Sequence, residues 1–436
     1  MIAIIEKYFV ILRPMNYNTC TLASGLRVIH LPSQSEVVFC GIGVKAGTRH
    51  EQKGEEGLAH FCEHLSFKGT ARRSAVQIIN AIEGLGGELN AFTNKEDTIF
   101  YCAIQRNHFK KAVDVLCDIV FNSIYPQEEL EKEREVVCEE IESYEDSPAE
   151  LIYDEFENIL FDGHPLGHNI LGSAEQVRGY DAEDVRRFTS RYYRPDNCVF
   201  FASGDINFKI LTATLAKKGL SENESYKTYE SYESHESHES HESHESHETN
   251  GPHTPQEIVR HRDTHQAHVM IGSPAYSAED PRRWALYLLN NILGGPGLNS
   301  RLNMTLREHN GLVYSVESTM VCYSDTGIWS VYFGCDQRDV RLCRKLVRRE
   351  LNRLMKHPLS PTQLQNAKRQ LQGQLAIASD SREQFALDFA KNFLHSGTER
   401  DLTDIMTHID RLTAADLQQV ANEMFSEERI TTLIYC

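Results

Sequence analysis

The chain has 436 residues, which is too long for one hydrophobic core and enough for two large domains. Its 40% apolar, 9% aromatic and 25% charged residues are ordinary for a globular protein, and a net charge of −18 argues against nucleic acid as a partner, since that needs clustered Lys and Arg. Eleven cysteines without a C-x-x-C pair indicate free thiols in a reducing compartment and exclude a disulfide framework.

The N-terminal stretch MIAIIEKYFVILRPM is apolar, but Glu6 and Lys7 interrupt it. It lacks the basic region and cleavage site of a signal peptide and the Arg/Ser richness of a transit peptide. No apolar run is long enough to span a bilayer. We therefore expect a cytoplasmic protein without a membrane partner, whose true start is either Met1 or Met15.

Two elements are predicted first along the chain. The alternating segment VVFCGIGVKAG, residues 37–47, predicts a strand. The segment GEEGLAHFCEHLSFKG, residues 54–69, predicts a helix that is led by acidic residues and ended by Lys68 and Gly69.

This helix carries a candidate metal motif, H-x-x-E-H. His60, Glu63 and His64 share one face, because positions i, i+3 and i+4 of a helix lie side by side. Two imidazoles one turn apart can hold one Zn²⁺, and the carboxylate can reach a metal-bound water. Chance produces the pattern in roughly one such chain in ten, so a third ligand has to decide between a metal site and ordinary polar residues. Cys62 points away from the histidine face, and we interpret it as a buried thiol and not as a nucleophile or ligand.

A second helix, predicted over residues 126–146 and opened by Pro126, is rich in glutamate. Its buried face is marked by apolar residues at spacings of seven, four and three, namely Leu130, Val137, Ile141 and Tyr144. Glu133 and Glu140 lie on or beside that face, whereas the other glutamates point elsewhere. A carboxylate that faces inward must bind a metal or a basic side chain. Glu133 and Glu140 therefore fit one metal ligand and one hydrogen-bond acceptor for another ligand. The alternative is that both form salt bridges with Arg or Lys.

The middle of the chain is a Ser-(Tyr/His)-Glu repeat over residues 221–250, with nine Glu, one Lys and no aliphatic residue. Such a segment cannot bury a core, and we interpret it as a linker. Five histidines at spacings of three, His235, His238, His241, His244 and His247, form no zinc motif, although loose metal binding is the alternative.

The two halves on either side of the linker resemble each other. DTIFYCAIQ and the helices after it are echoed, about 230 residues later, by DTGIWSVYF and two helices, the second opened by Pro361. We predict an α+β chain with two similar α/β domains: 15–220 as the N-terminal domain, 221–256 as the linker and 257–436 as the C-terminal domain.

Three further segments complete a family resemblance. H-x-x-E-H with EREVVCEE, in which Glu140 lies 76 residues after His64, resembles the pitrilysin/insulinase family of zinc metallopeptidases, and most of all its short bacterial members. GGELNAFTNKEDT resembles the substrate-binding edge strand of that family, and LREHNGLVYS resembles its Arg/Tyr pair. The second half lacks the motif, as the family's inactive half does, while the Ser-His-Glu linker is not a family feature.

The resemblance implies two domains that face each other as a clamshell. One Zn²⁺ is then bound by His60, His64 and Glu140, and Glu133 hydrogen-bonds a ligand histidine. Glu63 is the general base that accepts the proton of the zinc-bound water.

The resemblance also assigns the residues that bind the substrate. Arg307 and Tyr314 hold the substrate and stabilise the oxyanion, whereas spacing alone favours helix-dipole neutralisation and core packing for them. Asn90, Ala91 and Phe92 add the substrate as an extra strand. NNILGGPGLNSR, residues 290–301, lacks the order of a phosphate loop and is interpreted as a turn near the substrate chamber.

We therefore expect a zinc endopeptidase that acts on peptides or unfolded polypeptides. The sequence does not decide between a monomer and a homodimer. The mitochondrial processing peptidase β subunit shares the fold and the motif, so a subunit that processes organellar presequences is one alternative. A non-catalytic scaffold of the same fold is the other.

Overall fold

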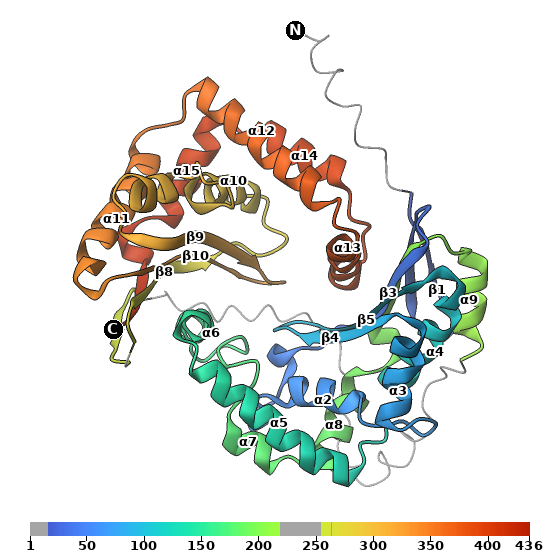
Figure 1. Cartoon of the computed structure of the whole chain (residues 1–436). Helices are drawn as coiled ribbons and strands as arrows, with labels where there is room; N and C mark the ends of the chain where they lie inside the picture. Colours follow the sequence, from blue (N-terminus) through green and yellow to red (C-terminus); the bar gives the residue numbers. More distant parts are fainter. Residues whose placement is uncertain (1–15, 219–253, 263) are drawn as a thin grey trace, which may run out of the picture.

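The computed structural model describes residues 16–218, 254–262 and 264–436 of the chain (Figure 1). The repeat and all but the last three residues of the predicted linker lie outside the described residues, as does the N-terminal stretch with Met1 and Met15. Each of the two sheets is formed within one predicted domain range, and we propose the same boundaries for the domains. They are called the N-half (15–220) and the C-half (257–436) below.

The N-half is built on a mixed sheet with the strand order β1-β2-β6-β3-β5-β4. Neighbouring strands are antiparallel, except that β2 and β6 are parallel. The strands are β1 (Asn18–Thr21), β2 (Arg27–Pro32), β3 (Val37–Val44), β4 (Glu88–Thr93), β5 (Thr98–Gln105) and β6 (Cys198–Gly204). The predicted strand at 37–47 is thus β3, and β4 is an edge strand that pairs only with β5.

The helices of the N-half are α2 (Leu58–Ser66), α3 (Ala75–Ile82), α4 (Phe109–Phe121), α5 (Gln127–Glu145), α6 (Pro148–Leu160), α7 (Ala174–Gly179), α8 (Ala182–Tyr192) and α9 (Phe208–Ala216). The predicted metal-motif helix is α2, which is shorter at both ends than residues 54–69. The glutamate-rich helix is α5, and Pro126 is its N-terminal cap residue, as predicted.

The C-half repeats the design with the strand order β7-β11-β8-β10-β9. Its strands are β7 (Glu257–Arg260), β8 (Ala267–Ala275), β9 (Val313–Cys322), β10 (Gly327–Cys335) and β11 (Thr431–Tyr435). Its helices are α10 (Arg283–Gly294), α11 (Val340–Lys356), α12 (Pro361–Ala378), α13 (Arg382–Ser396), α14 (Leu402–Arg411) and α15 (Ala414–Met424), with a π-helical turn, η7, at Asn303–Glu308.

The duplication predicted from the sequence is confirmed by the order of the elements. The run β4, β5, α4, α5, α6 in the N-half matches β9, β10, α11, α12, α13 in the C-half. None of the helices in the described ranges combines the length and apolar character that crossing a membrane would require.

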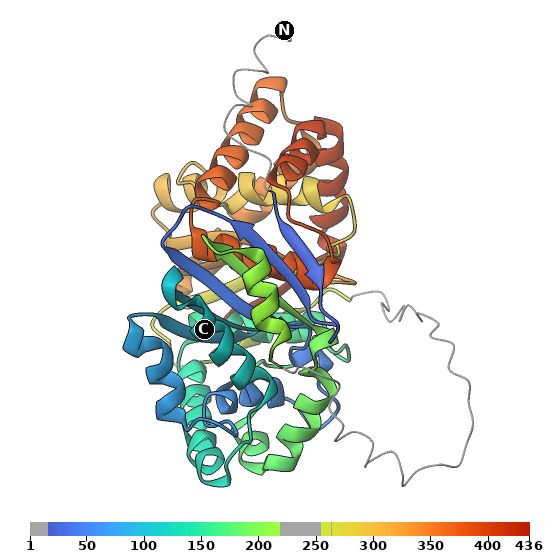
Figure 2. The same ribbon diagram turned by 90° about the vertical axis from the view of Figure 1, so that its right-hand side faces the viewer.

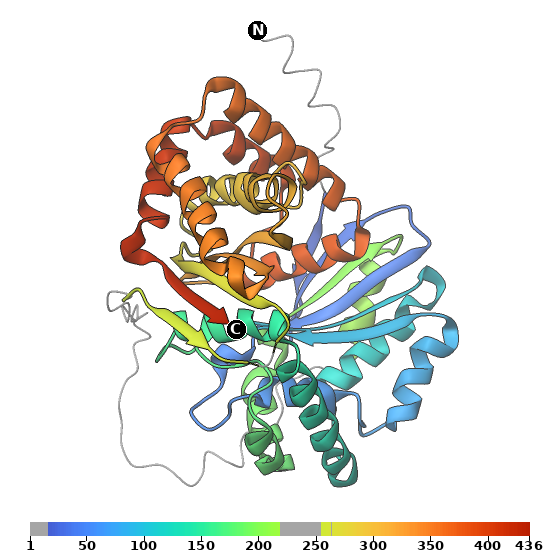
Figure 3. The same ribbon diagram turned by 60° about the vertical axis from the view of Figure 1, so that its left-hand side comes forward.

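The equivalent helices α6 and α13 are exchanged between the halves. Helix α13 packs on β3 and β6 of the N-half sheet, and α6 packs on β8 and β11 of the C-half sheet (Figure 1). Buried residues of α13 such as Phe389 and Leu394 share an apolar cluster with Phe201. Phe156 of α6 shares another with Tyr435. Figures 2 and 3 show the C-half, yellow to red, stacked on the blue to green N-half.

Candidate metal centre

Helix α2 carries the H-x-x-E-H motif, and the side chain of Glu51, several residues before the helix, caps its N-terminus. Gly57, with φ of 92°, turns the chain into the helix. The carboxylate of Glu51 accepts the backbone N–H of Gly57 at 3.0 Å and of Ala59 at 2.7 Å. His168 binds the same carboxylate at 2.8 Å. These bonds satisfy amide groups that the first turn of a helix leaves without a partner, and they fix where the motif begins.

The three predicted ligands converge between α2 and α5. The donor atoms of His60, His64 and Glu140 all lie within 4.8 Å of one another. Oε2 of Glu140 is 3.9 Å from Nε2 of His60 and 3.4 Å from Nε2 of His64. Two imidazole nitrogens and a carboxylate oxygen are a common zinc donor set, and these separations suit metal–ligand distances of about 2.0–2.2 Å. The residues therefore fit zinc, and no other such group of His, Cys, Asp and Glu occurs in the described ranges.

Glu133 orients one of the imidazoles. It is buried on α5, and its carboxylate accepts the Nδ1–H of His64 at 2.9 Å. Its second oxygen lies 2.6 Å from Nζ of Lys68. A hydrogen bond at Nδ1 leaves the lone pair of Nε2 for a metal. Burial alone would raise the pKa of Glu133, but its bonds with His64 and Lys68 hold that pKa below the usual value.

The two histidines differ in their affinity for a proton. Burial, and then the neighbouring His64, lower the pKa of His60 to about 4. Burial also disfavours the charged form of His64, but its hydrogen bonds with Glu133 and Glu140 raise its pKa to about 9. The site thus concentrates negative charge on the His64 side, which suits a bound cation.

Glu63 lies beside the ligands but outside the ligand set. Its side chain is buried, and Oγ1 of Thr93 donates a hydrogen bond of 2.6 Å to its Oε2. Burial raises the pKa of Glu63, although the bond from Thr93 opposes that shift. A buried carboxylate with a raised pKa next to a metal site is suited to proton transfer.

Two sequence predictions about this region need correction. The face of α5 was expected to turn both Glu133 and Glu140 inward, but the side chain of Glu140 is 45% exposed. The apolar spacing locates the face of a helix but not its edge, and Glu140 lies at that edge. Lys68 was expected to end the helix near Gly69, whereas α2 ends at Ser66 and Lys68 pairs with Glu133.

Cys62 is fully buried, as predicted, and burial raises the pKa of its thiol well above the usual value. That protonated, inaccessible sulfur agrees with the packing interpretation.

The predicted substrate strand is β4, the edge of the N-half sheet nearest to α2. Asn90 is exposed, and Ala91 and Phe92 are half-buried. Because β4 pairs with β5 on one side only, its other side presents backbone groups that can pair with an added strand.

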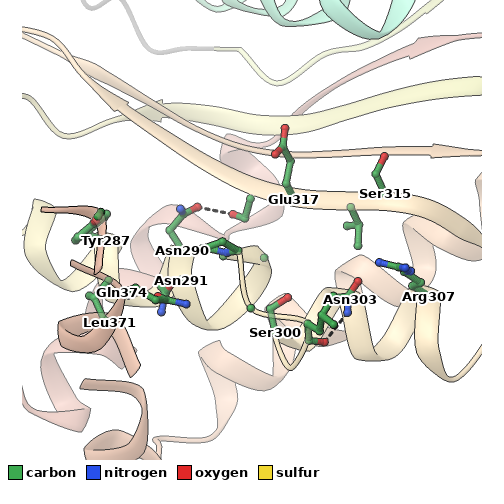
Figure 4. A pocket seen from close by; sticks show the side chains of 18 of the residues that line it. Tyr287, Asn290, Asn291, Ser300, Asn303, Arg307, Ser315, Glu317, Leu371 and Gln374 are labelled. Carbon is green, nitrogen blue, oxygen red and sulfur yellow. Dashed lines mark hydrogen bonds between the residues drawn. The ribbon is translucent and has the colours of Figure 1, made fainter. Parts of the chain in front are cut away.

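Arg307 and Tyr314 lie apart from the histidine cluster. Both line a cavity of about 600 Å³ within the C-half, formed by α10, η7, β9 and α12 together with the loop of residues 295–300 (Figure 4). Tyr314 is 83% exposed, which rules out the core-packing alternative. Neither residue contacts Glu63 in the described parts of the chain. The site in the N-half and this cavity are therefore separate surfaces.

Figure 4 shows how the cavity is arranged around its polar groups. Asn290 accepts a hydrogen bond of 2.5 Å from Ser318, and Asn303 donates one of 2.5 Å to the carbonyl of Leu298. Glu317 points to the opposite side of β9 from Asn290. The segment interpreted as a turn near the chamber supplies the end of α10 and one wall of this cavity.

Comparison with known proteins identifies the family to which this chain belongs. The profile of the family described as Insulinase (Peptidase family M16) matches residues 27–174, and the profile described as Peptidase M16 inactive domain matches residues 180–371. A protein of Streptomyces coelicolor named an uncharacterized zinc protease is 32% identical over 95% of this chain and 88% of its own length. The chain belongs to the insulinase family, peptidase family M16.

Other proteins are similar to this chain along nearly its whole length. A Bacillus subtilis protein, also named an uncharacterized zinc protease, is 30% identical over 95% of this chain and 97% of its own length. A protease structure from Helicobacter pylori has a TM-score of 0.85 at 23% identity, covering 97% of this chain and 100% of that one. A Pseudomonas fluorescens structure described as a peptidase M16 inactive domain has a TM-score of 0.83 at 19% identity, covering 97% and 98% of the two chains. Both structures support the two-domain fold.

Several residues of the site were not predicted from the sequence. Thr93 immediately follows the predicted substrate-binding residues Asn90, Ala91 and Phe92, and the sequence indicated only a helix end at Lys68. Glu51 precedes α2 by seven residues, outside the usual capping positions. A threonine at the end of an edge strand carries no signal by itself, and only the folded hairpin shows what its hydroxyl contacts.

Proposed function

We propose that the chain is a zinc-dependent endopeptidase, which hydrolyses peptides or unfolded segments of polypeptides in a chamber between its halves. The observation that carries this proposal is the convergence of His60, His64 and Glu140 beside the separate buried carboxylate of Glu63. Membership of a peptidase family, and relatives named zinc proteases, support the same conclusion.

The residues of the site have two roles: three are metal ligands, and one transfers protons. His60, His64 and Glu140 would hold one Zn²⁺, and when bound this ion lowers the pKa of a water molecule towards neutrality. Glu63 accepts a proton from the attacking water and passes it to the leaving amine. The Thr93 hydroxyl keeps the accepting carboxylate in place.

The substrate would contact both halves. Its backbone pairs with the free edge of β4 at Asn90, Ala91 and Phe92, a mode that selects extended backbone more than particular side chains. When the halves close on the peptide, Arg307 and Tyr314 would contact it from the C-half and stabilise the negative charge of the tetrahedral oxygen. An extended and unfolded segment meets these requirements, whereas a folded domain does not.

The test combines metal analysis with an activity assay. Purified full-length protein should carry about one Zn²⁺ per chain and cleave members of a peptide library, and a chelator should abolish cleavage until zinc is restored. Glu63→Gln should retain zinc but lose roughly 10²–10⁴-fold in turnover, because an amide cannot accept the proton. Glu140→Gln should instead weaken zinc binding.

Two results would contradict the proposal. Cleavage that survives complete removal of metal would exclude the zinc mechanism. Bound zinc without cleavage of any peptide in the library would favour the scaffold alternative.

A further inference from the structure

The turn between β4 and β5, residues 94–97, stands directly beside the proposed general base. Thr93, the last residue of β4, pairs with Thr98 across this hairpin and donates its hydroxyl to Glu63 at 2.6 Å. The exposed fractions of Thr93 and Glu63 are 8% and 7%, so water cannot readily replace this bond. The direction of the Glu63 carboxylate therefore depends on the position of the hairpin end.

One element of the C-half holds this turn through a charged cluster. Ser324, in the turn between β9 and β10, donates its backbone N–H at 3.2 Å and its hydroxyl at 2.6 Å to Glu96. Arg49 donates to Glu96 at 2.5 Å and to both carboxylate oxygens of Asp325. The backbone N–H of Arg49 also binds the carbonyl of Lys95 at 2.8 Å, so the cluster fixes backbone as well as side chains.

A second element of the C-half, helix α13, holds the same turn at its other end. Nε2 of His395 lies 2.9 Å from Oδ2 of the buried Asp97. Asn94 donates to Oδ1 of Asp97 at 2.7 Å and so closes the turn. Nζ of Lys391 lies 3.9 Å from Oδ1 of Asp97 and 4.6 Å from the ring centre of Phe92 in β4.

These contacts differ from the others that join the halves. Tyr323 donates to Glu157 at 2.5 Å, and Arg260 donates to Glu155 at 2.9 Å, but both acceptors lie on α6 and neither is a residue of the β4–β5 turn. The halves are thus held together elsewhere. The β9–β10 turn and α13 of the C-half nevertheless bind one four-residue turn of the N-half. Thr93, which contacts Glu63, directly precedes that turn.

We propose that the C-half positions the general base through the β4–β5 turn. Thr93 is a positioning residue for Glu63, and Ser324, Asp325 and His395 act on Thr93 through the turn. This inference rests on the function proposed above. It means that hydrolysis needs the C-half to orient a group of the N-half, in addition to the residues that the C-half supplies to the substrate.

The first test removes the hydroxyl and then restores it. Thr93→Val keeps the branched shape, and we expect it to lower kcat by roughly ten- to a hundredfold, as misplacement of a catalytic group does. KM should stay within about twofold and the zinc content should not change, because Thr93 binds neither metal nor substrate side chains. Thr93→Ser keeps the hydroxyl and should recover most of the turnover. Equal losses in both variants would overturn the assignment of Thr93.

The second test is a double-mutant cycle between the halves. Asp325→Ala should lower kcat by roughly three- to tenfold, within the usual size of coupling between distant sites. In the Thr93→Val background the same change should have no further effect, because the path to Glu63 is already broken. The matched control is Arg260→Ala, which removes an ion pair between the halves without touching the turn and should leave kcat unchanged. Losses that multiply in the double variant, or an equal loss in the control, would overturn the proposal.

A third measurement does not depend on activity. In zinc-free full-length protein, Asp325→Ala and His395→Ala should each increase amide hydrogen exchange in residues 88–105, whereas Arg260→Ala should not. Unchanged exchange in both variants would overturn the coupling. If the wild-type chain binds no zinc or cleaves no peptide, the proposed function fails, yet this measurement still decides whether the C-half holds the turn.

Discussion

At the scale of single residues, the metal centre depends on a line of contacts that runs outward from the ligands. Nδ1 of His64 meets Glu133, and Glu133 meets Lys68. An ionised, well-anchored acceptor at Nδ1 fixes the tautomer and the ring angle and makes Nε2 a better donor to a metal. The bonds with His64 and Lys68 hold the pKa of Glu133 below its usual value, although burial acts to raise it.

The first prediction concerns this line. Glu133→Gln should weaken zinc affinity by about 10–100-fold, because the amide is a poorer acceptor and does not pair with Lys68. Lys68→Met should produce a smaller loss of the same kind. Zinc affinity can be measured by competition with a chelator. Glu139→Gln, an exposed change on the same helix, is the matched control and should bind zinc like the wild type. Equal affinities in all four proteins would show that Glu133 is only a packing residue.

The second prediction concerns the pair in the C-half cavity. Losing one oxyanion donor typically lowers turnover by about 10²–10³-fold, and we expect Arg307→Ala or Tyr314→Phe to reduce kcat/KM in that range. Zinc content should not change, since neither side chain contacts the histidine cluster. The melting temperature should also stay within error, because Tyr314 is 83% exposed and buries little on folding. Full activity in stably folded variants would show that neither residue takes part in hydrolysis.

At the scale of elements, the placement of α2 decides whether the motif can work. The helix enters from a glycine turn, and Glu51 satisfies two of its N-terminal amides while buried against His168. The acidic residues that lead the helix in sequence are engaged elsewhere: Glu55 accepts from Arg191 at 2.6 Å.

The third prediction follows from that capping. Glu51→Ala should lower the free energy of unfolding by about 1–3 kcal/mol, the typical effect of leaving buried donors without a partner. Because the start of α2 would fray, zinc affinity should fall as well, although Glu51 is not a ligand. Denaturant unfolding of the zinc-free protein and a zinc titration separate the two effects. Glu56→Ala, a change in the same loop that leaves both α2 amides bonded, serves as the control.

The same element shows what could be predicted from the sequence. Helical periodicity was sufficient to bring His60, Glu63 and His64 to one face, and the family resemblance was needed to choose Glu140 from the glutamates of α5. Contacts that depend on a turn or on the opposite half could not be predicted, because nothing in the local pattern of Thr93 or Asp325 specifies its partner. The exchange of α6 and α13 was missed for the same reason, since amphipathic spacing identifies the apolar face of a helix but not the sheet that it covers.

At the scale of the whole molecule, that exchange makes each half incomplete. One face of the N-half sheet, with Ile99, Val199 and Phe201, is covered by α13, which belongs to the C-half. The C-half sheet is covered in turn by α6 of the N-half. An isolated half would expose an apolar sheet face to water. We therefore expect the two halves to fold against each other and to stay together without a covalent link.

The last prediction tests this by cutting the chain after it has folded. A specific protease site placed within residues 224–248, a stretch with no aliphatic residue, should be cleaved without loss of the folded assembly. The cut protein should elute from a sizing column as one particle and retain its zinc and its turnover, because two reciprocal helices and their apolar clusters hold the halves together. Phe389→Ala, at a fully buried position of α13, should cost about 3–5 kcal/mol of that association and let the cut halves separate, whereas the uncut variant remains one chain. Halves that part as soon as the wild-type chain is cut would show that the continuous chain, and not the exchanged helices, maintains the two-domain assembly.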